Sequence, residues 1–335
     1  MSGHVFTGIR KGFSNGSYYT SNFLNYLFVP RIWYQHRLEK TMSAFSSEQI
    51  QLMKKRADYY NKLASCTPLN GGVTVGDYHF PYRKYVADGK ARRFTSYFND
   101  QYRVMKYFPS HYRFRFIHGD VTQIPSHPTF VKSRPIGNDN ENAVILKLDS
   151  RRHFQFVKDN LPFSEKKDML VSRTTWCNAR PWRRLFCEMF WNHSMCNVGK
   201  SQPEVHEDFP ESVKGFMSIE EQLQYKFIAC IEGIDVATNL KWVMSSNSIA
   251  VSAPMKFETW FMEGTLIPNY HYIEVKPDYS DLIEKLNYYI SHQDKAEAII
   301  KHAHEYVSMF MDESSELATQ LLVAKKYFTL TNSQL

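Results

Sequence analysis

Three segments of the sequence carry residue types that can hold a phosphate or move a proton. In the first, residues 225–251, an apolar run meets Glu232-Gly233 and passes into apolar residues at helical spacing. A strand that enters a helix in this way can present free N–H groups to a phosphate. A single glycine is far from a dinucleotide-binding or Walker motif, and neither motif occurs here. An ordinary strand-to-helix turn explains the local pattern equally well.

The second segment contains arginines that follow an apolar run at residues 168–172. The planar guanidinium group suits bidentate contact with phosphate oxygens. Arg173 comes directly after the expected strand, which makes it the better candidate ligand. Arg184 lies further on in an expected helix, where a solvated basic surface is the favoured interpretation. Arg180 and Arg183 lie between them.

The third segment holds Asp120 just past an expected strand, with Lys132 and Arg134 at the end of the next one. A lone carboxylate at a strand end beside cations can act as a general base. It can equally be a structural aspartate in an ion pair, because such pairs are common. From the residues alone the structural interpretation is favoured.

The sequence contains no metal-binding pattern. No Asp-x-Asp pair occurs, and the 13 histidines show no ligand spacing. The 5 cysteines include no C-x-x-C pair and are expected to be reduced. We therefore expect no cofactor and no metal, so that cations and helix N-termini would have to neutralise any bound diphosphate.

Composition limits the class of protein. A chain of 335 residues with 43% hydrophobic residues predicts two folded domains. It has no apolar run of about 18 residues and no apolar stretch near its N-terminus, which predicts a cytoplasmic protein. The net charge of +7 favours anionic partners. It is not concentrated in one stretch and no nucleic-acid signature is present, so no nucleic-acid partner is expected.

The elements that would carry these residues alternate between strand and helix. Residues 46–64 predict a surface helix with a capping box at Ser46 and Gln49, and a second box begins at Ser218. Beyond about residue 165, expected strands at 168–172, 226–231, 248–253 and 271–275 alternate with expected helices at 181–194, 236–244, 256–263 and 279–292. This pattern predicts an α/β fold with a parallel sheet, followed by two more helices.

The block of residues 225–285 resembles glycosyltransferase family 90, the lipopolysaccharide-A-like and capsule-associated group that includes protein O-glucosyltransferases. The similarity extends over residues 110–310 and includes the HGDVTQIP, RRHF and SRTTW segments. Length and N-terminus look like those of a bacterial, cytoplasmic member. The resemblance implies a GT-B-like fold with two Rossmann-like domains facing a cleft. We expect an acceptor-side domain at residues 1–165, a nucleotide-sugar domain at 166–310 and a C-terminal helix at 311–335.

The resemblance also implies roles for individual residues. Asp120 matches the family's catalytic base, and Arg173 matches an arginine that contacts the nucleotide diphosphate. Asn239 stands where some members have arginine, so Lys241 is expected to supply that charge. The expected nucleotide-sugar site comprises Lys132, Arg134, Arg152, Arg173, Gly233, Ile234, Asp235, Val236, Ala237, Thr238, Asn239 and Lys241.

The implied reaction is inverting and metal-independent. A hexose or pentose would move from a UDP-sugar to a hydroxyl of a glycan or glycolipid acceptor of the lipopolysaccharide-core or capsule type. The aromatic segment at residues 25–34 suits peripheral contact with the inner membrane, although a buried helix explains it as well. The alternative function is a non-catalytic nucleotide- or glycan-binding protein of the same fold.

Overall fold

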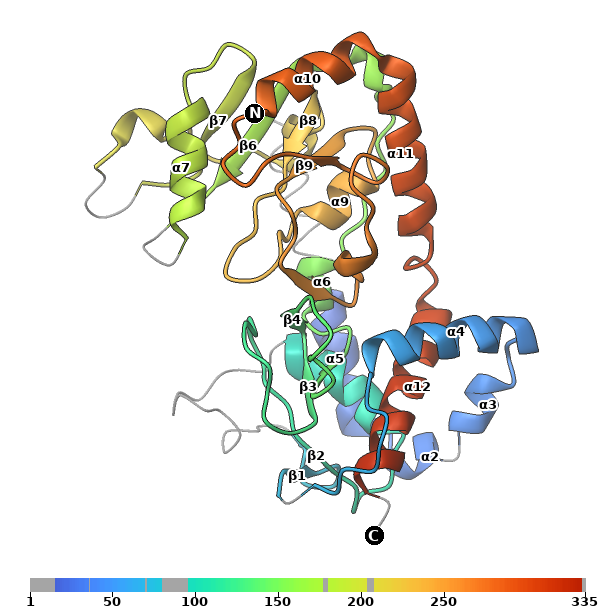
Figure 1. The fold of residues 1–335 in the computed structure, drawn as a ribbon. Helices are drawn as coiled ribbons and strands as arrows, with labels where there is room; N and C mark the ends of the chain where they lie inside the picture. Colours follow the sequence, from blue (N-terminus) through green and yellow to red (C-terminus); the bar gives the residue numbers. More distant parts are fainter. Residues whose placement is uncertain are drawn as a thin grey trace. The chain divides into compact units, whose positions relative to one another are not determined.

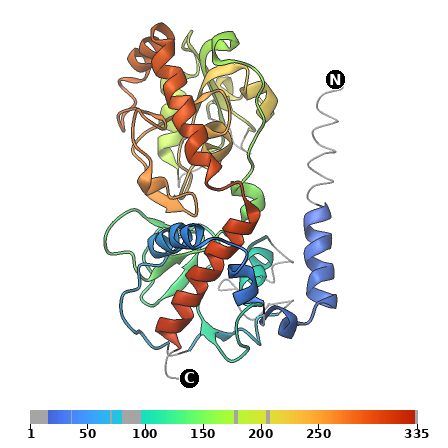
Figure 2. The same cartoon turned by 90° about the vertical axis from the view of Figure 1, so that its right-hand side faces the viewer.

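The computed structural model of the chain describes residues 16–35, 37–69, 71–79, 96–176, 180–203 and 208–332. The chain divides into two compact units. The first unit comprises Met1–Arg151 and Asp312–Leu335, and the second comprises Arg152–Met311. Figures 1 and 2 show the chain leaving the first unit and returning to it at the end.

The second unit is built on a parallel sheet of five strands in the order β11-β9-β8-β6-β7. The strands are rich in apolar residues, and β8 and β9 are buried along their whole length, as expected for a sheet covered on both faces. This confirms the predicted α/β class with a parallel sheet. The strands are β6 (Lys167–Thr174), β7 (Cys196–Lys200), β8 (Tyr225–Ala229), β9 (Ile249–Ser252) and β11 (Ile273–Glu274).

Helices of the second unit pack their apolar stripes against this sheet. The helix α7 begins at a proline, which suits the first helical position because its missing N–H would have no partner there. The core contains side chains from α7, α10 and α11 together with the strands. The helices and the remaining strand are α7 (Pro181–Phe190), α8 (Ile219–Gln222), α9 (Leu240–Met244), α10 (Leu282–Ser291), α11 (Gln293–Ser308) and β10 (Phe257–Thr259).

The first unit combines helices with two small sheets. Residues 16–28 are helical, β1 and β2 pair antiparallel, and β3 and β5 pair parallel. Its further elements are α2 (Arg31–Gln35), α3 (Leu38–Met42), α4 (Ser47–Tyr60), β1 (Val73–Thr74), α5 (Ser96–Met105), β2 (Arg113–Phe114), β3 (Thr129–Val131), β4 (Ser133–Pro135), β5 (Ala143–Ile145), α6 (Ser150–His153), which runs into the second unit, and α12 (Glu313–Thr331).

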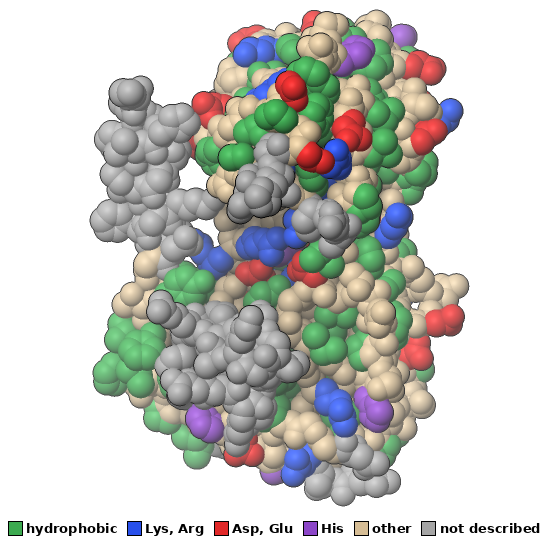
Figure 3. Space-filling model, turned by 90° about the vertical axis from the view of Figure 1, so that its left-hand side faces the viewer, with side chains coloured by type: hydrophobic (Ala, Val, Ile, Leu, Met, Phe, Trp, Pro, Cys, Tyr) green, Lys and Arg blue, Asp and Glu red, His purple; other side chains and the backbone are tan. Residues whose placement is uncertain are grey.

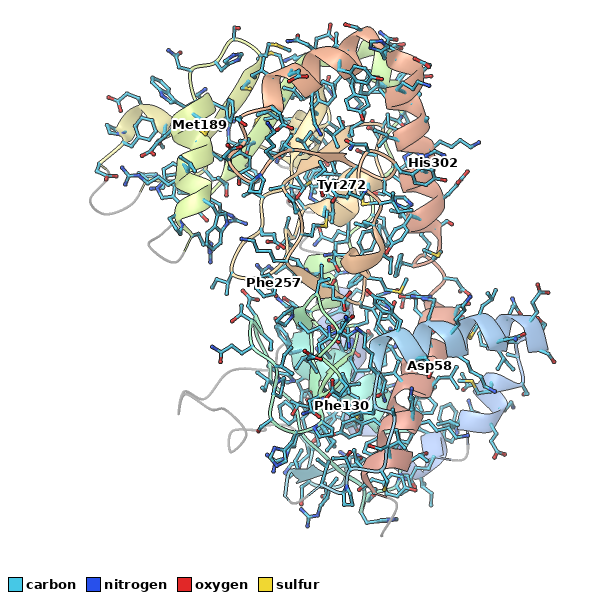
Figure 4. The ribbon with its side chains drawn as sticks, viewed as in Figure 1. Asp58, Phe130, Met189, Phe257, Tyr272 and His302 are labelled. Atoms are coloured by element: carbon cyan, nitrogen blue, oxygen red, sulfur yellow. The ribbon has the colours of Figure 1, made fainter. Side chains whose placement is uncertain are left out.

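The last helix, α12, completes the core of the first unit. It contacts α4 and α5, as Figure 1 shows. Phe130, labelled in Figure 4, is fully buried, with its ring centre 4.1 Å from that of Tyr327 on α12. Glu316 on α12 is also buried, and it accepts ion pairs from Arg56 at 2.7 Å and Lys147 at 2.9 Å. The C-terminal segment is therefore an interior part of the first unit.

The sequence patterns predicted most helices and strands of the second unit, but two predicted helices differ from the structure. Both predicted capping boxes, at Ser46 and at Ser218, are present. The predicted helix at 256–263 is instead β10 followed by a short 3-10 turn. The predicted helix at 236–244 begins only at Leu240. No helix among the described residues is both long and apolar enough to cross a membrane.

Candidate functional site

The strand order of the second unit creates a switch point between β6 and β8. From β6 the chain moves through α7 to β7 on one side, and then returns to place β8 on the other side of β6. The segments that leave the carboxyl ends of β6 and β8 therefore depart in opposite directions. In open parallel sheets, ligands bind at such a point.

Arg183, in the first turn of α7, joins the two segments at this switch point. Its Nε donates to the carbonyl oxygen of Glu232 at 2.9 Å and its Nη2 to that of Ile231 at 2.9 Å, both just after β8. Its Nη1 donates to the carbonyl oxygen of Thr175, just after β6, at 3.3 Å. Trp182 donates from its indole Nε1 to the Glu232 carbonyl as well. One guanidinium group thus fixes the main chain on both sides of the switch point.

Glycine at position 233 suits this arrangement. A Cβ atom added there would lie 3.3 Å from Nη2 of Arg183, which is tighter than most such contacts. The glycine thus leaves the Arg183 guanidinium free to approach the main chain. The sequence predicted this glycine as part of a ligand loop, and the structure gives it a packing role beside Arg183.

Residues 233–239 form the second part of the loop between β8 and α9, which begins at residue 230. Ile234 is exposed, whereas Asp235, Val236 and Ala237 are buried. Asn239 donates from Nδ2 to the carbonyl oxygen of Ala229 at 2.9 Å, which ties the end of the loop back to β8. Thr238 beside it is half-buried.

The helix after this loop differs from the one that the sequence predicts. The sequence predicts a helix over residues 236–244 whose N-terminus would face a bound phosphate. The observed helix starts at Leu240 and has 5 residues. A helix this short has little aligned dipole, so it adds little positive potential at the loop.

Lys241 lies in the interior, against a carboxylate. Its side chain is fully buried, and its Nζ is 2.5 Å from Oε1 of Glu263, which is itself 1% exposed. Thr259 donates to Glu263 from its backbone N–H at 2.6 Å. The sequence predicts that the positive charge of Lys241 contacts the diphosphate. In the structure, the carboxylate of Glu263 neutralises this charge.

Glu232 connects the loop to the segment after β9. Its carboxylate Oε1 accepts backbone N–H groups from Lys256 at 2.9 Å and Phe257 at 3.3 Å. Burial raises the pKa of Glu232, while these hydrogen bonds act in the opposite direction. A small hollow lies here, with only about 10 Å³ open to a water molecule, lined by Glu232, Val236, Ala237, Leu240, Ser252, Met255, Phe257 and Glu263.

Arg173 occupies the end of β6, as predicted, but its guanidinium turns toward β7. Nη1 donates to the carbonyl oxygen of Asn197 at 2.8 Å, and Nη2 donates to the Asn197 side chain at 2.9 Å. Burial lowers the pKa of Arg173. Its contact with a diphosphate stays a prediction, as does that of Arg152, which is exposed.

Asp120 and Lys132 meet in the first unit. Lys132 Nζ is 2.5 Å from Oδ1 of Asp120, and the Lys132 side chain is 1% exposed. The Asp120 side chain keeps 23% of its surface exposed, so the carboxylate remains accessible. Val121, the next residue, donates its backbone N–H to Ser133 Oγ at 3.1 Å and fixes the segment against β4. A held but accessible carboxylate suits a base that receives a proton from a bound hydroxyl.

Arg134 is fully buried and serves the fold of the first unit. Nη2 donates to the carbonyl oxygen of Tyr59 at 2.8 Å, and Nη1 donates to those of Tyr60 at 3.1 Å and Ala143 at 3.0 Å. Tyr59 and Tyr60 end α4, where carbonyl groups lack helical partners and a cation is favourable. These contacts favour a structural role for Arg134.

The sequence did not single out Arg183, Glu232 or Glu263. Arg183 was one of several arginines near the start of an expected helix, and nothing local separates it from Arg184. The available signal is its position in the first turn of the helix expected at residues 181–194, which follows the strand expected at residues 168–172. Glu263 carried no signal, because its partner Lys241 lies 22 residues away.

Comparison with known proteins decides the family. The model of "Glycosyl transferase family 90" matches residues 186–332. The protein named O-glucosyltransferase LpsA from Dichelobacter nodosus is 40% identical over 316 residues, covering 91% of this chain and 93% of the relative. The chain belongs to glycosyltransferase family 90. The resemblance seen in the sequence is confirmed, and the protein is a glycosyltransferase.

Two viral proteins share part of this family 90 chain. Uncharacterized protein 179R of Invertebrate iridescent virus 6 is 31% identical over 175 residues, which cover 49% of this chain and 14% of the viral protein. Uncharacterized protein 035R of Invertebrate iridescent virus 3 is 28% identical over 131 residues, or 38% of this chain and 12% of the viral protein. Both viral proteins are thus much longer than the regions they share with this chain.

Proposed function

We propose that this family 90 member transfers glucose or a related sugar from a UDP-sugar to a hydroxyl group of a glycan acceptor. The observation that carries the proposal is the 40% identity with an O-glucosyltransferase along nearly the whole length of both chains. The acceptor proposed is of the lipopolysaccharide-core or capsule type. A GT-B-type fold, with donor and acceptor assigned to different units, belongs to the same proposal.

The donor is assigned to the switch point of the second unit. The loop of residues 233–239 and the segment after β6 would surround the nucleotide diphosphate. Arg183 supports this assignment, because it holds both segments and brings a positive charge to their junction. That charge would attract the negatively charged diphosphate and help to hold the donor in place.

Asp120 is assigned as the catalytic base. Its carboxylate would take the proton of the acceptor hydroxyl while that oxygen forms a bond to the anomeric carbon. The bond from the anomeric carbon to the UDP oxygen breaks, and UDP leaves with the electron pair. This single displacement inverts the anomeric configuration. Lys132, in contact with Oδ1 of Asp120, would act as a positioning residue that orients the carboxylate.

The decisive experiment compares Asp120→Asn with Asp139→Asn. Asp139 is an exposed carboxylate of the same unit, so it controls for loss of charge. We expect Asp120→Asn to lower transfer from a UDP-sugar by about 10²–10⁴-fold while UDP binding is retained. Asp139→Asn should keep full activity.

Three further arms of this experiment separate the alternatives. Transfer that survives in Asp120→Asn would refute the assignment of the base. A wild-type protein that binds UDP but releases none from any UDP-sugar would favour a non-catalytic binding protein. Loss of activity in EDTA, restored by a divalent cation, would refute metal independence.

A further inference from the structure

The N-terminal helix of residues 16–28 has two contrasting sides. Positions 18, 22, 25, 26 and 29 are half-buried, at the spacing of one helical face. The opposite positions are exposed and mostly apolar, and the same surface continues into α2. We call this the N-terminal apolar surface, with exposed fractions of 37% for Tyr19, 41% for Phe23, 47% for Leu24, 52% for Leu27, 74% for Phe28, 64% for Ile32 and 46% for Trp33.

The half-buried side anchors the helix to the rest of the first unit. The Tyr18 hydroxyl donates to Oδ1 of Asp100 on α5 at 2.6 Å. The Tyr26 ring packs edge-on against that of Tyr102 at 5.1 Å between ring centres. Asn25 donates to the Tyr34 hydroxyl at 2.8 Å. The orientation of the helix is thus fixed by its polar and aromatic side, and Figure 2 shows it at the margin of the first unit.

The apolar side is left facing outward. In Figure 3, hydrophobic side chains gather on the surface at the left edge, over this helix. Soluble proteins rarely expose a contiguous group of large apolar residues of this kind unless the surface binds something. Aromatic residues make up four of the seven, which is the composition preferred where an apolar phase meets water.

The sequence that carries this surface is basic. The first 38 residues contain no Asp or Glu and include Arg10, Lys11, Arg31 and Arg37, of which the first two lie outside the described residues. Arg31 donates to the carbonyl oxygens of Val75 and Tyr78. The guanidinium carbon of Arg37 lies 3.3 Å from the centre of the Trp33 ring, so a cation sits directly on the apolar surface. Contact between two copies through this surface would bring like charges together, which is unfavourable.

We propose that the N-terminal apolar surface docks on an anionic phospholipid bilayer. The helix lies in the plane of the interface, with Phe23, Leu27 and Phe28 among the acyl chains and Arg37 near the lipid phosphates. Apolar burial and attraction to anionic headgroups act together in this mode, so binding requires both. The inference does not depend on the proposed reaction, because the surface lies outside the residues assigned to it.

The test is co-sedimentation of the full chain with vesicles. We expect binding to vesicles that contain phosphatidylglycerol, weaker binding to vesicles of pure phosphatidylcholine, and loss of binding as salt rises. The double variant Phe28→Ser/Ile32→Ser should weaken binding by roughly tenfold or more, because each side chain loses its transfer from water. Arg37→Glu should weaken binding to the anionic vesicles alone.

The matched control is Phe216→Ser. Phe216 is 73% exposed, almost the same as Phe28, and it lies in the second unit. This variant should bind the vesicles as the wild type does. An equal loss in Phe216→Ser, or equal binding to both lipid compositions, would overturn the proposal.

Other occupants of the surface give different results. A wild-type dimer in sedimentation velocity that Phe28→Ser/Ile32→Ser converts to monomer would mean that a second copy covers it. No binding to the phosphatidylglycerol vesicles would also overturn the proposal. Transfer to a water-soluble acceptor should be unchanged in Phe28→Ser/Ile32→Ser, so this proposal and the proposed function can fail separately.

Discussion

Lys241 places a positive charge in the interior of the second unit, where Glu263 neutralises it. Both side chains are removed from water, so each depends on the other. Taking a charge into a protein interior is costly, and losing one member of such a pair leaves the other uncompensated. The pair therefore fixes the segment from β10 to Glu263 against α9, next to the proposed nucleotide loop.

Lys241→Met is predicted to lower the free energy of unfolding by about 3–5 kcal/mol, because Glu263 would remain buried and charged. Lys241→Met/Glu263→Gln should recover much of this loss. Lys301→Met removes an exposed pair with Glu305 in the same unit and should cost no more than about 0.5 kcal/mol. Urea unfolding followed by fluorescence measures all three. A Lys241→Met cost as small as that of Lys301→Met would contradict the interior ion pair.

At the residue scale, the sequence predicted types and positions better than partners. It placed Asp120, Lys132 and Arg173 at strand ends. Arg173 lies near the end of β6 and Lys132 directly after β3, whereas Asp120 lies in an irregular segment well beyond the short strand β2. It could not tell that Arg134 binds three carbonyl groups or that Arg173 turns toward Asn197. Side-chain direction depends on neighbours that are distant in sequence, and local patterns hold no information about them.

At the scale of elements, β6, α7 and β8 form the framework of the switch point. Arg183 connects them, because it lies at the start of α7 and reaches main-chain oxygens after both strands. Arg184, the next residue, points elsewhere and pairs with Glu188 and Asp208 on the surface. Two adjacent arginines therefore have separable roles.

Arg183→Ala is predicted to weaken UDP binding by roughly tenfold to a hundredfold, because three hydrogen bonds of about 1 kcal/mol each would be lost from the loops. Calorimetry with UDP measures this loss, and steady-state kinetics should show it mainly in KM for the donor. Arg183→Lys should restore binding in part.

Arg184→Ala is the matched control and should bind UDP like the wild type. Equal effects of the two substitutions would mean that Arg183 acts only through the general basic charge of α7. An Arg183→Ala protein that loses kcat with an unchanged KM would also contradict a positioning role in donor binding.

The predicted helix at residues 256–263 failed for a physical reason. The segment 256–263 has apolar residues at 257, 260 and 261, which is helical spacing. Its remaining residues include Glu258, Thr259 and Glu263, all buried, and the Lys241 pair holds this segment in another conformation. Periodicity assumes that polar residues face water. Where polar side chains are buried in pairs, tertiary contacts override it.

At the scale of the whole molecule, the first unit is assembled from both ends of the chain. The helix α12 supplies Tyr327 and Phe328 to the aromatic core, and Glu316 to the ion pairs with Arg56 and Lys147. The second unit is continuous in sequence. The two units therefore differ in what each needs in order to fold.

Removal of residues 312–335 is predicted to unfold the first unit, because its aromatic core would lose one wall. The fragment of residues 152–311 should instead fold alone, since its sheet and core are complete. Circular dichroism during heating checks both. Two transitions in the truncated chain, as stable as in the full chain, would contradict the prediction.

The return of α12 to the first unit also sets an order of events during synthesis. About 160 residues of the second unit emerge from the ribosome, and have time to fold, before the last helix is made. Until α12 has been made, the N-terminal part of the first unit exposes its aromatic core and the surface around Phe28 to water. Chains in this state are the ones most exposed to aggregation and proteolysis, until α12 packs against the rest of the first unit.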